Sequence, residues 1–163
     1  MKLSLVNRND DYPSLLQRAA DVAKAGRQLA LYDPETGLFA AWFFAMRCQD
    51  ECYRAVRYER PLTLLLIEVR NDGDDFLSAV GYVVRDLRAG RRTDVPSQLV
   101  AGRFAVLLPE TDTAGAEALA SRLEALAPGV ITVVASHPHD GENQEQLLAC
   151  AQQRMDTGDS LAA

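Results

Sequence analysis

Four arginines are concentrated in one short stretch of this 163-residue chain, and an aspartate follows them. The arginines are Arg85, Arg88, Arg91 and Arg92, and the aspartate is Asp94. An arginine can donate two hydrogen bonds to a phosphate or to the O6/N7 edge of guanine, and an aspartate can accept from guanine N1–H and N2–H. The stretch therefore suits a guanine nucleotide, although a solvated helix end followed by a loop fits the same residues.

A second group with chemical potential combines one carboxylate with two arginines. Glu68 lies near the end of the apolar run 62–69, Arg70 follows this run, and Arg103 follows Gly102 at a bend between two other apolar runs. A carboxylate alone could bind a divalent cation, but two nearby guanidinium groups repel one.

Two local matches resemble the GGDEF (diguanylate cyclase) family. The turn at 33–38 matches the Asp-x-Leu-Thr-Gly-Leu turn that opens these domains at its Asp, Thr, Gly and final Leu. The bend that carries Gly-Gly-Asp-Glu-Phe in the family reads Val-Ala-Gly-Arg-Phe at 100–104, and the apolar run that ends at Pro109 resembles the second strand of the family's signature hairpin.

The resemblance implies that Glu68 stands where an active cyclase has an aspartate, which shares two Mg²⁺ ions with acids of the hairpin. Gly102 and Arg103 stand in place of those hairpin acids, and Arg70 replaces a further acid of the family. The resemblance thus places both arginines beside Glu68, and we expect Arg103 or Arg70 to pair with it and to take the space that a metal ion would fill. Asp74 matches a guanine-contacting acid by position, with a helix N-cap as its alternative role. The resemblance therefore implies a domain without catalytic residues, metal, cofactor or cyclase activity.

The arginine stretch also has a counterpart in the family. Arg91 and Asp94, shortly before the bend, resemble the Arg-x-x-Asp motif of the inhibitory site through which many GGDEF domains bind cyclic di-GMP. Arg88 and Arg85, one and two helical turns earlier, would add charge for the second phosphate. A solvated loop without a ligand is the alternative interpretation.

Hydrophobic periodicity predicts the elements that must position these groups. Helices are expected at about 13–29, 39–58, 74–90, 113–126 and 147–155, and strands at 62–69, on both sides of the bend at 101–102, and at 129–135. The helix at 39–58 is expected to bury one face, formed by Trp42, Ala45, Met46, Cys52 and Val56.

The order of elements and the resemblance, which covers about residues 31–155, predict an α/β (α+β) fold. We expect a nucleotidyl-cyclase-like βααββαβ core, with a central and mainly antiparallel sheet flanked by helices. Residues 1–30 are expected to form a helical extension and residues 156–163 a flexible tail. The extension carries a narrow apolar seam that could pair with a second copy or pack on its own domain: Leu15, Ala19, Val22, Gly26 and Leu29.

Composition argues against several classes of partner and site. The net charge of −6 argues against generic binding to nucleic acid or anionic membrane. There is no long uncharged apolar run and no signal-peptide-like start, so a cytoplasmic location is expected. Cys48 and Cys52, one helical turn apart, and His137 and His139, on either side of a proline, have poor spacing for a metal site.

Three functions follow from these observations. The first is a catalytically inactive GGDEF-like domain that acts as a cyclic di-GMP receptor or signalling module, together with a protein partner of its pathway. The alternative is a nucleotide-free scaffold for protein–protein interaction that keeps only the fold. The third is an enzyme, which would need a metal site with one carboxylate and predicts Mg²⁺-dependent turnover of GTP.

Overall fold

A computed structural model describes residues 31–34, 36–70, 80–81, 83–85 and 93–158. The chain divides into the units Met1–Leu31 and Tyr32–Ala163, and all the elements below belong to the second. The helix predicted at 13–29 lies outside the described residues, and so do Asp74, Arg88, Arg91 and Arg92.

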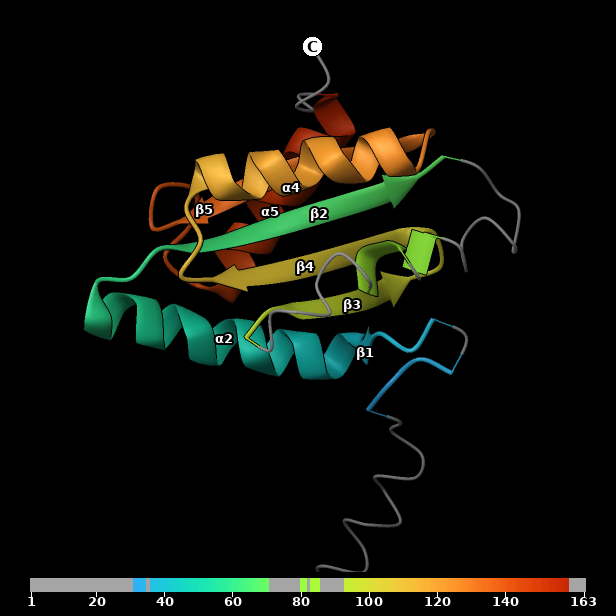
Figure 1. Ribbon diagram of the computed structural model, residues 1–163. Coiled ribbons are helices and arrows are strands. Elements are labelled where there is room, and N and C mark those ends of the chain that lie inside the picture. Colours follow the sequence, from blue (N-terminus) through green and yellow to red (C-terminus); the bar gives the residue numbers. More distant parts are fainter. Residues whose placement is uncertain (1–30, 35, 71–79, 82, 86–92, 159–163) are drawn as a thin grey trace, which may run out of the picture. The chain divides into compact units, whose positions relative to one another are not determined.

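A five-stranded sheet forms the centre of the described unit, with the strand order β1-β3-β4-β2-β5 (Figure 1). The strands are β1 (Phe39–Ala40), β2 (Leu62–Val69), β3 (Val95–Val100), β4 (Arg103–Pro109) and β5 (Val130–His137). β1 pairs with β3 in parallel, and the other neighbouring strands pair antiparallel. This arrangement confirms the predicted α/β class with a mainly antiparallel sheet flanked by helices.

β2 is central because its side chains are apolar on both faces. It pairs with β4 on one side and with β5 on the other. Leu65 and Ile67 point into one core and Leu64 and Leu66 into the other, and each is at most 2% exposed. Each such leucine contributes roughly 1.5–3 kcal/mol through burial. The prediction of a strand covered on both sides is confirmed.

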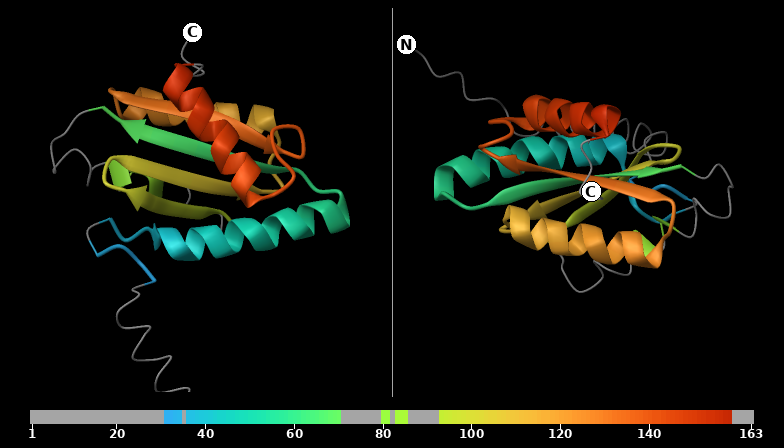
Figure 2. Two further views of the ribbon diagram at one scale, coloured as in Figure 1. Left: turned by 180° about the vertical axis from the view of Figure 1, so that it is seen from behind. Right: turned by 90° about the horizontal axis from the view of Figure 1, so that it is seen from above.

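Helices cover both faces of the sheet (Figure 2). They are α2 (Ala41–Tyr58), α4 (Thr113–Leu126) and α5 (Gln144–Thr157). α4 packs on one face, whereas α2 and α5 pack on the other. α5 continues beyond Met155, so residues 156 and 157, which the sequence analysis assigned to the tail, are helical. None of the helices in the described residues is long and apolar enough to cross a membrane.

The buried face of α2 differs from the predicted one. The helix buries Phe44, Cys48, Glu51, Cys52 and Ala55. Among the side chains expected in the core, three are exposed instead: Trp42 at 42%, Met46 at 46% and Val56 at 63%. The prediction was right for Cys52 and wrong for these three, because α2 has two apolar stripes of helical period, and a glutamate interrupts the stripe that is buried.

The carboxylate of Glu51 can be buried because two arginines of the same helix form ion pairs with it. Arg47 Nη2 donates to Glu51 Oε1 over 2.7 Å, and Arg54 Nη1 donates to the same oxygen over 3.2 Å. These residues stand four positions before and three positions after Glu51, so they lie on neighbouring turns. The buried carboxylate is thereby paired and hydrogen-bonded.

An ion pair ties α5 to the end of β5. Arg154 Nη2 lies 2.6 Å from Asp140 Oδ1, and the Asp140 side chain is 8% exposed. Burial works to raise the pKa of Asp140, but hydrogen bonds from Arg154, from the Ser136 N–H and from His139 outweigh it. Together they lower the pKa of Asp140 from 3.8 to about 2. The ionised carboxylate therefore stabilises the folded state.

Asp140→Asn should lower the free energy of unfolding at neutral pH by about 1–2 kcal/mol, because Arg154 loses an ionised partner. The folded-state pKa lies below 3.8, so this stabilisation is complete above about pH 4 and is lost as the pH falls towards 2. Urea unfolding of both chains between pH 7 and pH 3 measures the difference, which should shrink with acidification. A difference that stays constant across this range would contradict the assignment.

Candidate functional site

The β3–β4 hairpin brings Arg103 beside Glu68. Gly102 forms the tip with a φ of 76°, a left-handed conformation that suits glycine. β4 then pairs with β2 so that Arg103 stands directly opposite Glu68. Residues 35 positions apart in the chain are therefore neighbours across one strand pair.

Glu68 is engaged by two guanidinium groups. Arg103 Nη2 lies 2.5 Å from Glu68 Oε2, and Arg70 Nε lies 3.9 Å from Glu68 Oε1. The Glu68 and Arg103 side chains are 26% and 28% exposed, so water screens this pair only in part. The expected ion pair between Glu68 and an arginine is present. Of the two arginines, Arg103 lies closer to the Glu68 carboxylate.

α5 holds the other side of the Arg103 guanidinium. Arg103 Nη1 donates to Gln152 Oε1 over 2.5 Å, and Gln152 Nε2 donates to Asp156 Oδ1 over 2.6 Å. Arg103 is therefore fixed between the sheet and a helix. The sequence analysis did not find Gln152, because its distance of 49 positions from Arg103 gives no local signal.

The surroundings of Glu68 matter for the binding of a divalent cation such as Mg²⁺. Divalent cations of this kind need several oxygen ligands free of competing cations. Here the oxygens of Glu68 face Arg103 and Arg70. Within the described residues, no three or more His, Cys, Asp and Glu side chains gather closely enough to hold a metal ion.

The turn at 33–38 has the hydrogen bonds that its sequence indicates. Asp33 Oδ1 accepts from the Thr36 N–H and the Thr36 hydroxyl over 2.7 and 2.8 Å. Gly37 has a φ of 69°, and a Cβ placed on it would lie 3.2 Å from Arg85 Nη1. Arg85, one of the four proposed ligand contacts, therefore lies close to this turn.

Asp94 is the other described member of the proposed ligand set. It precedes β3 and is 5% exposed. Its neighbour Thr93 lines a cavity of about 260 Å³ near the C-terminal end of α2. The same cavity is lined by three arginines and two glutamates: Arg47, Arg54, Arg60, Glu51 and Glu110.

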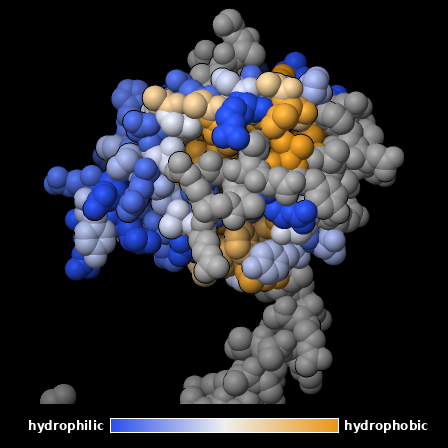
Figure 3. Space-filling view, in the orientation of Figure 1, coloured by the Kyte–Doolittle hydropathy of each residue, from blue (hydrophilic) through white to orange (hydrophobic). Residues whose placement is uncertain are grey.

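This arginine-lined cavity was not predicted from the sequence. Its cations come from α2 and the segment after it, more than 30 positions before Thr93 in the chain. Hydrophilic residues gather on the left of the face shown in Figure 3, at the end of the molecule where α2 finishes. This end of the domain therefore combines cationic and anionic groups, with Arg47 and Arg54 already paired with Glu51.

The described cysteines, Cys48, Cys52 and Cys150, are free thiols. The hydrogen bond with Cys52, together with burial, raises the pKa of the Cys48 thiol. Cys48 therefore stays protonated and packs as a small apolar group.

None of the protein-family models and none of the curated protein sequences matches the chain. Several solved structures, in contrast, match the chain. The GGDEF domain of TpbB (YfiN) from Pseudomonas aeruginosa is 22% identical, with 77% of this chain and 87% of that chain covered and a TM-score of 0.69. The coiled coil and GGDEF domain of DgcB from Caulobacter crescentus, in complex with c-di-GMP, is 16% identical, with 96% and 94% covered and a TM-score of 0.70.

A third similar structure contains a protein partner. The diguanylate cyclase SiaD from Pseudomonas aeruginosa, in complex with its activator SiaC, is 20% identical, with 96% of this chain and 73% of that chain covered and a TM-score of 0.68. At these identities the likeness establishes architecture. The chain has the fold of GGDEF, diguanylate-cyclase-like domains.

Proposed function

We propose that this chain is a catalytically inactive GGDEF-like domain that acts as a receptor for cyclic di-GMP in a signalling pathway. The observation that carries the proposed inactivity is the ion pair between Arg103 and Glu68. A cation approaching Glu68 would meet a fixed guanidinium, and two like unit charges about 4 Å apart repel by roughly 4 kcal/mol near a protein surface. The hairpin tip supplies Gly102 and Arg103, neither of which is an acid.

Cations at the end of α2 support the choice of a nucleotide ligand. Arg60 lines one cavity with Thr93, which belongs to the Arg-x-x-Asp stretch, and Arg47 and Arg54 line it as the partners of Glu51. A cavity of about 260 Å³ has room for a phosphate group but not for a whole dinucleotide. In our proposal one phosphate enters this cavity, and a guanine lies outside it against Arg91 and Asp94.

Asp94 sets a condition on this binding mode. Because this residue is 5% exposed, its carboxylate must become more accessible before it can accept from guanine. Binding therefore requires a local rearrangement just before β3. DgcB, a similar fold, has been solved with c-di-GMP, which supports this ligand over other anions.

Isothermal titration calorimetry of the full chain with cyclic di-GMP tests the proposal. We expect saturable heat with cyclic di-GMP and a much weaker response with GTP, which has one guanine. Absence of heat from a folded chain would contradict the receptor role.

The exposed stripe on α2 favours a second candidate, a scaffold for a protein partner. Trp42, Met46, Tyr53 and Val56 recur at steps of three, four or seven positions, and each is at least 42% exposed. A helix presents such residues on one side, where a partner helix can pack on them. The SiaD–SiaC complex provides an example of a similar fold with a protein partner.

A further inference from the structure

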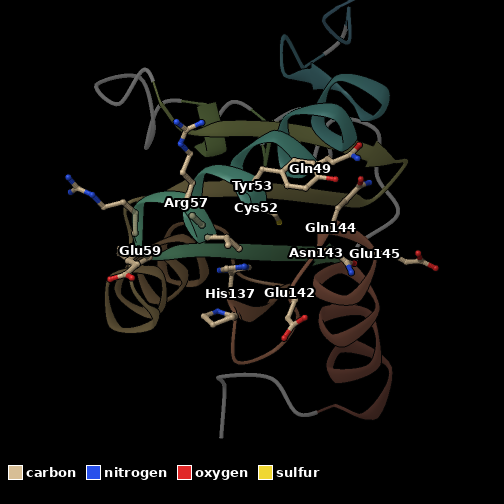
Figure 4. A pocket seen from close by; sticks show the side chains of 15 residues that line it. Gln49, Cys52, Tyr53, Arg57, Glu59, His137, Glu142, Asn143, Gln144 and Glu145 are labelled. Carbon is tan, nitrogen blue, oxygen red and sulfur yellow. The ribbon is translucent and has the colours of Figure 1, made fainter.

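A second and larger cavity lies at the opposite end of β2 from Glu68. Its volume is about 1150 Å³, and it is bordered by the second half of α2, the segment 59–61, the end of β5 and the start of α5 (Figure 4). The pairing of Leu62 with His137 marks this end of the sheet, whereas Glu68 pairs with Ile131 at the other end. The cavity is therefore separate from the Glu68 site.

A buried histidine lines this cavity without a partner. His137 is 8% exposed, and neither Nδ1 nor Nε2 has a hydrogen-bond partner among the described residues. Leaving a buried polar group unsatisfied costs about 1–3 kcal/mol. Both ring nitrogens are closed to solvent, so a ligand must first turn the ring to reach them, and a hydrogen bond made there would recover that cost.

The start of α5 lines the same cavity and favours a negative charge. The Asn143 side chain accepts a hydrogen bond from the Gln146 N–H, and the Asn143 carbonyl accepts one from the Leu147 N–H. The N–H groups of Gln144 and Glu145 then have no acceptor within the described residues. These N–H groups lie at the positive end of the helix dipole, which attracts a carboxylate.

The rest of the lining limits the ligand in size and charge. Apolar groups come from Cys52, Ala55, Val56, Pro61 and Pro138. They suit a flat or branched apolar body. Glu59, Glu142 and Glu145 also line the cavity, against Arg57 and Arg60. The carboxylates outnumber the guanidinium groups by one, and Glu145 itself belongs to the first turn of α5. The lining therefore disfavours a ligand with several negative charges, and a single carboxylate has the N–H groups of that turn as its partners.

We propose that this cavity is a binding site for an amphipathic monocarboxylate. The apolar body of the ligand lies along α2, on Val56 and its neighbours. The carboxylate is directed towards His137 and the first turn of α5. This cavity is distinct from the arginine-lined cavity, although Ala55, Arg60 and Pro61 line both.

Titration of the full chain, labelled in its two histidines, with phenylacetate tests this proposal. We expect the ring signals of His137 to shift saturably with a Kd of about 1 mM, which is typical of a small fragment. The neutral phenylacetamide and the tricarboxylate trimesate should each bind about tenfold more weakly. His139, whose side chain is 87% exposed, serves as the internal control and should shift little.

Two surface variants complete the experiment. Val56→Glu places a negative charge on the apolar wall and should weaken phenylacetate binding about tenfold. Leu126→Glu makes the same kind of change at an exposed residue of α4 and should leave the affinity unchanged. The proposal is overturned if His137 shows no saturable shift, if acid and amide bind equally, or if both variants bind like the wild type.

Discussion

Arg91→Ala will bind cyclic di-GMP about 100-fold more weakly than the wild-type chain. The proposed role of Arg91 is to donate two charge-assisted hydrogen bonds, and a loss of about 3 kcal/mol corresponds to that factor. Calorimetry at one fixed salt concentration measures the change, because phosphate contacts weaken as salt is added.

Two further variants separate geometry from charge. Arg91→Lys keeps the charge but loses the planar fork, so its affinity should fall between those of the wild type and Arg91→Ala. Arg122→Ala removes one exposed arginine from α4 and should bind like the wild type. Equal affinities for Arg91→Ala and Arg122→Ala would exclude Arg91 from the binding site.

Arg103→Glu should lower the free energy of unfolding by about 3 kcal/mol. The variant replaces the partner of Glu68 with a second carboxylate, directly opposite it in the sheet, and leaves Gln152 without its donor. We expect a fall of this size in the free energy of unfolding because the variant loses a largely buried ion pair and gains repulsion between two carboxylates. Urea unfolding measures it, with Arg122→Glu as the control for the same change of charge on an exposed surface.

The effect of Mg²⁺ on the unfolding of Arg103→Glu provides a second test. Two facing carboxylates attract a divalent cation, so Mg²⁺ should raise the midpoint of unfolding of Arg103→Glu but not that of the wild type. If Arg103→Glu were as stable as the wild type, Arg103 would not be the group that holds Glu68.

Much of the fold could be predicted because its strongest signals are local. β2 is apolar in every position but Thr63 and Glu68, and the glycine at 102 marks the hairpin. The cap of α4 is equally local: the Asp112 side chain accepts from the Gly115 N–H over 2.9 Å. Each of these features depends on a few consecutive residues.

Features that depend on tertiary context were missed. β1 has two residues, too few for a periodic signal, and it exists because it pairs with β3, where the Ser97 hydroxyl donates to the Phe39 carbonyl over 2.7 Å. The buried side of α2 could not be told from its exposed side, because the choice depends on burying Glu51 between Arg47 and Arg54.

The candidate sites show the same division. The Glu68–Arg103 contact was predicted through the family resemblance, which places the hairpin tip beside the end of the central strand. The arginine-lined cavity and the unpartnered ring of His137 were not predictable. Both arise where the end of α2 meets segments from later in the chain, and no spacing in the sequence encodes that meeting.

The account depends most on Arg103 occupying the place of a metal ligand, and the release of pyrophosphate from GTP tests this directly. We predict that the full chain with Mg²⁺ releases no pyrophosphate above the rate without protein, and that no cyclic di-GMP forms. Mg²⁺-dependent release that is lost in Glu68→Gln would show a functional metal site and contradict the account.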